Sequence, residues 1–264
     1  MPGGGWNRVL GRNGTVGKAI EVLDQVADHG RPVRFSELLD GSRFPKATLY
    51  RFLQSLVGQG MLAYDAERQT YMPGLRLVRL AHAAWQHSSL APIARPHVDA
   101  LAEVVREAVH LAQIDHGHVI FVDKRKKTNM FDTLAQTGLV APSYCTGVGK
   151  AILAFLPEET RSEALKMQAF VPYTPHTHRS PRSLWPELDQ IRDEGIAFDR
   201  EEHEQGIISV AAPIIPDQRR VVGAISIATS TSRRSLDELK TLSPTLRETA
   251  SRIAAEVQPW QFPN

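Results

Sequence analysis

The spacing of apolar residues near the start of the chain predicts three helices. The first is amphipathic and ends by Gly30, because its apolar residues recur every three or four positions. These residues are Val16, Ala19, Ile20, Leu23, Val26 and Ala27. A short second helix is expected to begin at Ser36, which would serve as its N-cap. Pro45 suits the first position of a third helix, which runs to about Gly58.

After residue 60 the helical period gives way to short apolar runs. Residues 61–64 and 69–72 read as two strands around the polar turn 65–68. Three helices followed by a hairpin predict a winged helix-turn-helix over residues 14–74. Residues 1–13 are expected to form a flexible arm, and another helical pattern predicts a linker helix over residues 75–90.

The pattern over residues 91–264 predicts a second, larger domain in which helices and hairpins alternate. Helices are expected over 93–106, from Gly149, after Pro157, and over 181–194 between Ser180 and Gly195. A hairpin is expected around the turn 115–118, followed later by two long strands at 207–215 and 220–228 and a last helix at 236–257. Strands joined by tight turns, with helices at the ends and middle, indicate an antiparallel α+β domain.

Composition narrows the class of protein without naming a function. The chain has 264 residues, of which 42% are apolar, so a disordered chain is excluded. Its longest apolar stretches are far shorter than a membrane-spanning helix, and the first twenty residues lack the apolar core of a secretory signal. A single cysteine, Cys145, excludes an internal disulfide framework. We therefore expect a soluble, cytoplasmic protein without membrane contact.

Charge is distributed unevenly between the two predicted parts. Residues 1–80 hold 11 Lys and Arg against 7 Asp and Glu, a net charge of +4, whereas residues 81–264 hold 20 against 22, a net charge of −2. This asymmetry favours a polyanion-binding module at the N-terminal end, although ordinary solvated charge could also produce it.

The polar face of the third predicted helix carries the side chains that a helix uses in the major groove of double-stranded DNA. Phosphate contacts are expected from basic residues on and around this helix, namely Arg34, Lys46, Arg51 and Arg68. Base edges are expected to be read by Thr48, Tyr50 and Gln54. The alternative is a solvated helix face in an ordinary trihelical core. The wing and the local basic excess favour DNA.

Several short segments, in order and with matching spacing, carry a family resemblance. In the first part they are Phe35–Leu38, Pro45–Leu53 and Tyr71–Gly74. In the second part they are Ala94–His97, Val109–Leu111, Gly147–Ala151 with Leu153–Pro157, Tyr173–Thr177, Asp199–His203 with Gly206, and Ser209–Ile214. From about Gly14 to Ser235 the chain resembles the IclR family of bacterial transcription regulators.

The resemblance implies a winged-helix DNA-binding domain and a GAF-like domain that binds a small organic acid. It also implies homodimers, or homotetramers built as pairs of dimers, that bind palindromic operators. Carried over by motif, the effector contacts are Gly147, Val148, Asp199, Ser209 and Ser226. The family often has a further serine two residues after Ser226, and here Ala228 replaces it. One hydrogen bond to the effector is therefore absent from the expected set.

The residues support an anion site independently of the resemblance. Gly147-Val148-Gly149 comes just before a predicted helix, where unpaired N–H groups and the helix dipole attract a carboxylate. The alternative is that these glycines only build a tight helix entry and the serines are satisfied within the core. The pocket has three aromatic candidates, Phe121, Tyr144 and Phe198. Because these provide no clear stacking platform, an aliphatic or sugar-derived acid is favoured.

Enzyme-like features do not assemble into a catalytic site, so the chain is predicted not to be an enzyme and to need no cofactor. Gly149-Lys150 lacks the first glycine of a P-loop, and no Gly-x-Ser-x-Gly is present. His176 and His178 could start a metal site but lack closely spaced further ligands, so no metal is predicted. Cys145, beside a helix N-terminus, could have a lowered pKa and sense redox state, or could be a packed pocket residue.

Two questions stay open at the level of the sequence. The basic cluster 124–127 is expected to be a solvated hairpin end, with DNA or an anionic ligand as alternatives. The function is expected to be that of a repressor whose DNA affinity depends on the effector through coupled equilibria. The competing functions are a sensor whose winged helix contacts proteins, and an enzyme that acts on a small acid through Asp199 or His203.

Overall fold

The computed structural model describes residues 14–88, 90–126, 133–216 and 220–257. The predicted arm, residues 1–13, lies outside this range. The chain forms two compact units, residues 1–86 and 87–264. A helical unit with a small sheet is followed by a unit built on a larger antiparallel sheet, which confirms the predicted α+β class.

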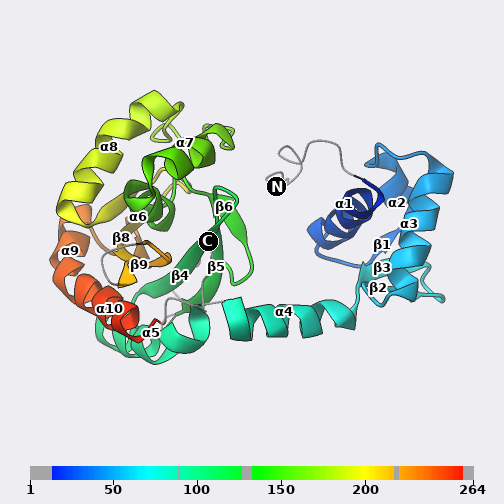
Figure 1. Ribbon diagram of the computed structural model, residues 1–264, viewed down its shortest axis with the longest axis horizontal. Helices are drawn as coiled ribbons and strands as arrows, with labels where there is room; N and C mark the ends of the chain where they lie inside the picture. The colour runs from blue at the N-terminus through cyan, green and yellow to red at the C-terminus, as the bar shows by residue number, and fades with distance from the viewer. Residues whose placement is uncertain (1–13, 89, 127–132, 217–219, 258–264) are drawn as a thin grey trace. The chain divides into compact units, whose positions relative to one another are not determined.

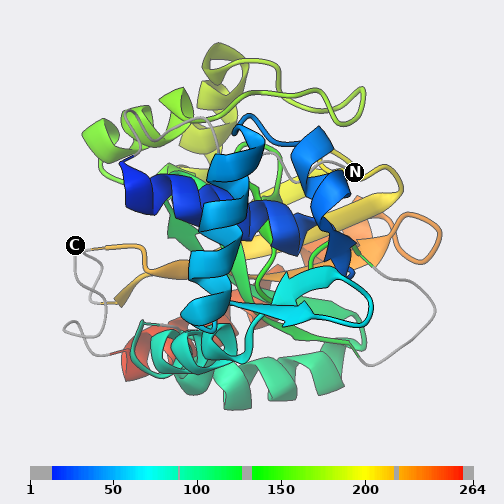
Figure 2. The same ribbon diagram turned by 90° about the vertical axis from the view of Figure 1, so that its right-hand side faces the viewer.

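The first unit is a winged helix (Figure 1). It contains α1 (Thr15–Asp28), β1 (Val33–Arg34), α2 (Phe35–Asp40), α3 (Lys46–Gly58), β2 (Leu62–Asp65) and β3 (Thr70–Pro73), and α4 (Leu75–Ser88) runs from it to the start of the second unit. α1 packs across α3, and the β2–β3 hairpin lies against the same core (Figure 2). The predicted apolar stripe of α3 is buried, as are Val22, Leu23 and Val26 of α1. Periodicity therefore identified the buried face of α3, whereas Val16, Ile20 and Ala27 of the stripe predicted for the first helix are exposed.

Three details of the first unit differ from the sequence prediction. α2 begins at Phe35 with Arg34 as its N-cap rather than Ser36, because the Glu37 carboxylate accepts the Arg34 N–H at 3.0 Å. Pro45 is the N-cap of α3 rather than its first residue, since its backbone is still extended at ψ 148°. Strand β1 was not predicted, because two residues are too few to show alternation.

The second unit has a six-stranded antiparallel sheet in the order β6-β5-β4-β9-β8-β7. Its strands are β4 (Ala108–Asp115), β5 (His118–Arg125), β6 (Val140–Pro142), β7 (Ala197–Arg200), β8 (Ile207–Ile214) and β9 (Gly223–Ser230). Its helices are α5 (Ala91–Val105), α6 (Gly147–Phe155), α7 (Glu158–Lys166), α8 (Pro181–Glu194), α9 (Leu236–Thr241) and α10 (Ser243–Glu256). The predicted central hairpin is β4–β5.

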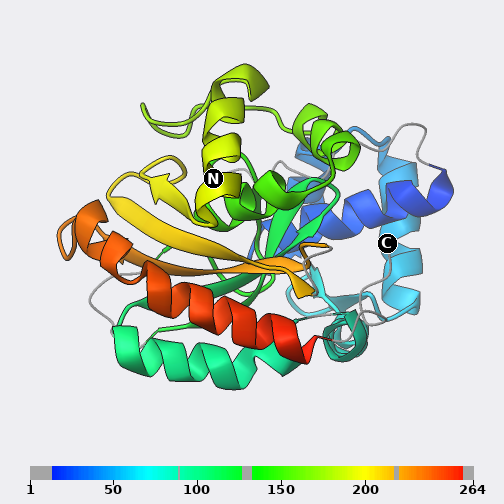
Figure 3. The ribbon, with the colours of Figure 1, turned by 60° about the vertical axis from the view of Figure 1, so that its left-hand side comes forward.

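The sheet is covered on both faces (Figure 3). α5 and α10 pack together on one face, and α6 packs on the other with α8 behind it. Eight of the nine residues of α6 are buried, from Gly147 to Ala154. α8 begins at the N-cap Ser180, whose side chain accepts the Ser183 N–H, and ends at Gly195 in the left-handed conformation at φ 67°. Both limits agree with the sequence prediction.

Other boundaries in the second unit correct the prediction. The last helix is two helices, α9 and α10, because Pro244 follows Leu242 closely and cannot donate a backbone hydrogen bond to the preceding turn. β9 begins at Gly223 rather than at residue 220, and α6 begins at Gly147 rather than Gly149. The short strands β6 and β7 were not predicted. Among the helices of the described residues, none is long and apolar enough to cross a bilayer.

Candidate functional site

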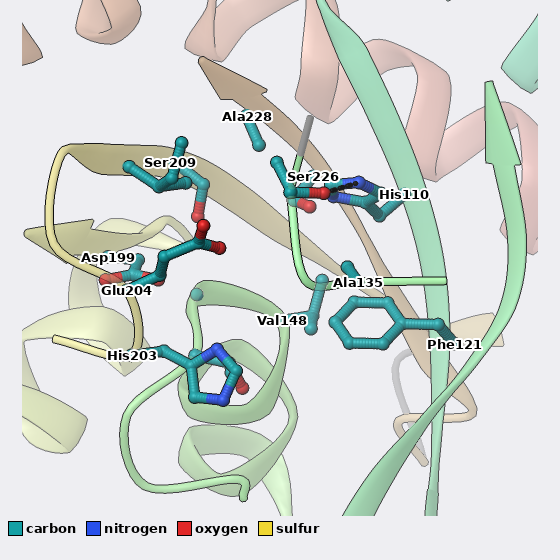
Figure 4. Close-up of a pocket in the computed structure, with 14 residues that line it drawn as sticks. His110, Phe121, Ala135, Val148, Asp199, His203, Glu204, Ser209, Ser226 and Ala228 are labelled. Atoms are coloured by element: carbon teal, nitrogen blue, oxygen red, sulfur yellow. Dashed lines mark hydrogen bonds between the residues drawn. The ribbon is translucent and has the colours of Figure 1, made fainter. Parts of the chain in front are cut away.

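A small pocket lies between the N-terminus of α6 and the face of the sheet that α6 covers (Figure 4). Two rows of paired strand residues form its floor. In one row Ser209 pairs with Asp199 and Ala228, and in the other Ser226 pairs with His110. Because side chains alternate along each strand, this register turns both serines toward α6.

All five residues predicted to contact the effector line this pocket, namely Gly147, Val148, Asp199, Ser209 and Ser226. Their role in binding stays a prediction. The pocket has further lining residues, namely His110, Phe121, Thr133, Ala135, Thr146, His203, Glu204, Ile207 and Ala228. Strand alternation could have identified His110, since it precedes the buried Ala112 by two positions. Nothing local in the sequence indicates Thr133, Ala135 or Glu204, because they belong to loops.

The N-terminus of α6 supplies unpaired backbone donors to the pocket. Thr146 is the N-cap, and its Oγ1 accepts the Gly149 N–H at 3.2 Å. Within the described residues, no hydrogen bond uses the N–H groups of Gly147 or Val148. These two donors and the positive end of the helix dipole form an environment suited to a carboxylate.

A side chain at either glycine of this turn would collide with a neighbouring group, and the group differs between the two positions. A Cβ at Gly147 would lie 2.6 Å from the Ser209 Oγ, inside the pocket. A Cβ at Gly149 would collide with the backbone of Ser143, outside the pocket lining. Gly149 therefore permits a tight helix entry, and Gly147 leaves room beside Ser209 in the pocket, while anion binding at this turn stays a prediction.

Burial is the largest cause of the pKa shifts of the pocket residues Asp199 and His203. Burial, together with the nearby Glu202 carboxylate, raises the pKa of Asp199 to about 7. Lys150 and the backbone N–H groups of Glu202 and His203 oppose this shift, and the Glu202 N–H donates to Asp199 Oδ1 at 2.8 Å. Burial also lowers the pKa of His203, which favours its neutral form. Asp199 can thus act as a hydrogen-bond donor or acceptor near neutral pH.

Loop residues close the pocket on its outer side. Thr133 Oγ1 lies 3.2 Å from His110 Nε2, and a Glu204 carboxylate oxygen accepts the Leu134 N–H at 3.0 Å. Lys124 Nζ donates to the Ala135 carbonyl at 2.7 Å. The pocket has a volume of about 40 Å³, which is room for only a few water molecules.

The basic cluster 124–127 is not the solvated hairpin end that the sequence predicted. Lys124 donates a hydrogen bond to the carbonyl of the pocket residue Ala135, and Arg125 forms ion pairs with Asp99 and Asp123. Both side chains are partly buried, while Lys127 lies outside the described residues.

A buried ionic network lies directly behind the pocket. The Lys150 ammonium is fully buried, binds Glu187 Oε1 at 2.7 Å and contacts Glu202. His178 Nε2 lies 2.7 Å from Glu187 Oε2, which brings His178, Glu187 and Glu202 close enough to share a cation. Lys150 already supplies positive charge between the two carboxylates, and Arg200 adds a second cation on Glu187 at 2.7 Å. His176 is not part of this group.

Cys145 and two of the three aromatic candidates, Tyr144 and Phe198, do not line the pocket. Burial is the main cause that raises the pKa of the Cys145 thiol, which is opposite to the alternative of a lowered pKa. Cys145 is a packed, fully buried residue, as the other alternative expected, but it does not line the pocket. Tyr144 packs against Phe170 at 4.5 Å and donates its hydroxyl hydrogen to the Val171 carbonyl at 2.8 Å. Neither Tyr144 nor Phe198 lines the pocket, whereas Phe121 does.

The predicted DNA contacts lie on the winged helix. Six of the seven side chains are exposed, namely Arg34, Lys46, Tyr50, Arg51, Gln54 and Arg68, and Thr48 is half-buried. Arg68 lies at the wing tip, 3.9 Å from Asp65. Burial and the neighbouring Tyr64 and Tyr50 raise the pKa of Tyr71, and the Gln54 side chain opposes this shift. Their contacts with DNA stay predictions.

Both units match models of known protein families. Residues 82–255 match the family described as "Bacterial transcriptional regulator IclR C-terminal". Residues 15–66 match the "IclR helix-turn-helix domain". The chain belongs to the IclR family. The resemblance drawn from the short segments is therefore confirmed, and the IclR family consists of DNA-binding transcription regulators rather than enzymes.

Relatives within the IclR family match along nearly the whole chain. The transcriptional regulator KdgR of Escherichia coli (strain K12) is 27% identical over 246 residues, which cover 93% of each protein. The repressor YiaJ of the same organism is 31% identical, over 90% of this chain and 84% of its own length. The crystal structure of Thermotoga maritima IclR matches with a TM-score of 0.70 at 29% identity, over 91% of this chain and 97% of that one.

Proposed function

We propose that this IclR-family chain is a repressor whose binding to a palindromic operator is controlled by a small organic acid. In this proposal it acts in the cytoplasm as a homodimer or homotetramer. A two-fold assembly would present two copies of α3 to successive major grooves, with half-site spacing dependent on α4. Named relatives include the repressors YiaJ and IclR of Escherichia coli and the acetate operon repressor of Salmonella typhimurium.

The pocket under α6 is the observation that supports an acid as effector. The N–H groups of Gly147 and Val148 would bind the carboxylate, while Ser209, Ser226 and Asp199 would bind oxygens elsewhere on the molecule. No Lys or Arg lines this pocket among the described residues, so the helix terminus is its main source of positive potential. A hydroxylated, sugar-derived acid would use Asp199 and Ser209 as well as the helix terminus.

The size of the pocket connects binding to conformational change. In this proposal, a sugar acid exceeds the pocket volume of about 40 Å³ and moves the lining segment 133–135 outward as it binds. A ligand that binds only the opened arrangement shifts the population toward it. Repression would respond to the effector if the closed and opened arrangements differ in DNA affinity.

A thermal-shift experiment tests the acid proposal. The full chain would be heated with acetate, lactate, gluconate or benzoate, which differ in length and hydroxylation. One of them should raise the Tm of the wild type, because a ligand at about 100 times its Kd stabilises the native state by about 2.7 kcal/mol.

The matched variants locate the binding site. Ser209→Ala and Ser226→Ala should each reduce the shift, whereas Ser251→Ala, which removes an exposed hydroxyl on α10, should leave it unchanged. If none of the acids stabilises the protein, or if both pocket variants respond as the wild type does, this effector class is wrong.

A further inference from the structure

The winged helix contains a second concavity, larger than the pocket under α6. It lies between the N-terminal ends of α2 and α3 and the hairpin β2–β3. Nine residues line it, and we call it the tyrosine groove: Arg34, Phe35, Ser36, Lys46, Ala47, Tyr50, Tyr64, Gln69 and Tyr71. All of them belong to one compact unit, so the shape of the groove does not depend on how the two units are placed.

The tyrosine groove has a basic edge. Arg34 and Lys46 are both exposed, and no carboxylate lines the groove among the described residues. By contrast, two other arginines of the same unit have acidic partners. Arg31 binds Glu37 and Arg43 binds Glu21, with N–O distances of 2.5 and 2.6 Å. Among the described residues, the side chains of Arg34 and Lys46 form no ion pair, although the Glu37 carboxylate accepts the Arg34 backbone N–H, and two such cations suit a polyanion.

Aromatic rings form the floor and walls of the groove. Tyr64 and Tyr71 are cross-strand partners with ring centroids 4.8 Å apart. Phe35 meets Tyr50 edge-on at 6.1 Å. Tyr71 is buried, whereas Tyr64 is 42% exposed and Tyr50 is 53% exposed. Two hydroxyl groups thus remain available as donors on a rigid aromatic surface.

The geometry of α3 separates Tyr50 from the face of the helix that points away from the core. The buried stripe of α3 is Leu49, Phe52, Leu53 and Leu56. At 100° per residue, the opposite face is centred on Ala47, Arg51 and Gln54. Lys46 and Tyr50 lie on the flank beside the wing, and both line the groove. A side chain on this flank is better placed for the DNA backbone than for a base edge.

We propose that the tyrosine groove binds one sugar-phosphate segment of the DNA backbone. This inference rests on the proposed DNA-binding function and extends it. Arg34 and Lys46 neutralise the phosphate, the Tyr50 and Tyr64 hydroxyls donate to its oxygens, and the rings pack on the sugar. Tyr50 then holds the protein in register on the duplex and does not read a base. Binding in the groove is accordingly independent of sequence.

Fluorescence anisotropy with two 30-bp duplexes, one AT-rich and one GC-rich, tests the proposal across a range of salt concentrations. Arg34→Gln and Lys46→Gln should each lower the slope of log K against log salt by about 0.9, because each variant leaves one phosphate without its cation. Tyr50→Phe and Tyr64→Phe keep the rings and should weaken binding of both duplexes about five-fold, with an unchanged slope. Arg43→Gln removes an equal charge outside the groove and should leave the slope within about 0.2 of the wild type.

The possible failures are distinguishable. If the wild type binds both duplexes and the four groove variants bind like it, the tyrosine groove does not contact the backbone. An equal loss of slope in Arg43→Gln would mean that the general field of the domain, and not the groove, attracts DNA. If Tyr50→Phe weakened binding of only one duplex, Tyr50 would be a base reader and the proposal would be wrong. A wild type that binds neither duplex would overturn the DNA-binding function as well.

Discussion

Asp199 lines the candidate pocket, and its buried carboxyl group also affects the stability of the fold. Its carboxyl group is held in place by the Glu202 N–H, at 2.8 Å, yet it is enclosed next to a second carboxylate. The free-energy cost of ionising it there is the physical reason for a pKa near 7, against an ordinary value of 3.8. The folded state therefore binds this proton more tightly than the unfolded state.

Asp199→Asn is expected to change how stability depends on pH. In the wild type, Asp199 lowers the free energy of unfolding as pH rises from about 4 to about 7, by up to about 4 kcal/mol for a shift of this size. Asn cannot ionise, so the variant should gain stability relative to the wild type between pH 5 and pH 8. Urea unfolding at both pH values measures this gain.

A control variant isolates the effect of burial. Glu163→Gln, which changes an exposed carboxylate on α7, should show the same difference from the wild type at both pH values. A pH-independent difference for Asp199→Asn as well would show that its carboxyl group titrates normally.

At the scale of elements, α6 links the pocket to the rest of the second unit. Its N-terminus faces the pocket, and one turn later Lys150 connects the helix to Glu187 on α8 and to Glu202 after β7. Arg200 shares Glu187 but remains 44% exposed. Because Lys150 is enclosed with its partners, removal of its charge leaves Glu202 buried without a cation.

Lys150→Met should destabilise the protein by about 3–5 kcal/mol, the usual cost of breaking a buried ion pair from one side. Arg200→Gln should cost less than about 1 kcal/mol, because its ion pair is partly solvated. Chemical unfolding of the two variants compares them directly. If both variants lost the same free energy of unfolding, the buried ion pairs of Lys150 would stabilise the fold no more than a surface ion pair does.

At the scale of the whole molecule, the proposed function depends on coupling between two units with different charge. The basic excess lies in residues 1–80, in which the winged helix carries its exposed cations. The candidate effector pocket lies entirely in the second unit. Binding at one can influence the other only through arrangements of the protein that both ligands distinguish.

The coupling should therefore be reciprocal. An acid that shifts the Tm should change the affinity for operator DNA by about 5- to 150-fold, and saturating operator should change the affinity for that acid by the same factor. Titrations of each ligand in the presence and absence of the other measure both factors. If the acid binds in the pocket but neither factor differs from one, the pocket does not regulate DNA binding.

The sequence by itself determined the features that depend on local pattern. Periodicity located the core of α3, Ser180 and Gly195 set the limits of α8, and the spacing of short segments identified the IclR family. Ser209 and Ser226 were expected in the pocket because their positions match the family motif, and both line it. These signals need only a few neighbouring residues, which is why they are readable in one chain.

Only the tertiary structure decided the properties that depend on distant neighbours. Burial raises the pKa of the Cys145 thiol, and Lys124, expected at a solvated hairpin end, donates a hydrogen bond to the carbonyl of the pocket residue Ala135. The tyrosine groove likewise required β2 and β3 to bring Tyr64 and Tyr71 beside α3. Desolvation and cross-strand register arise from contacts between segments far apart in sequence, so local pattern does not contain them.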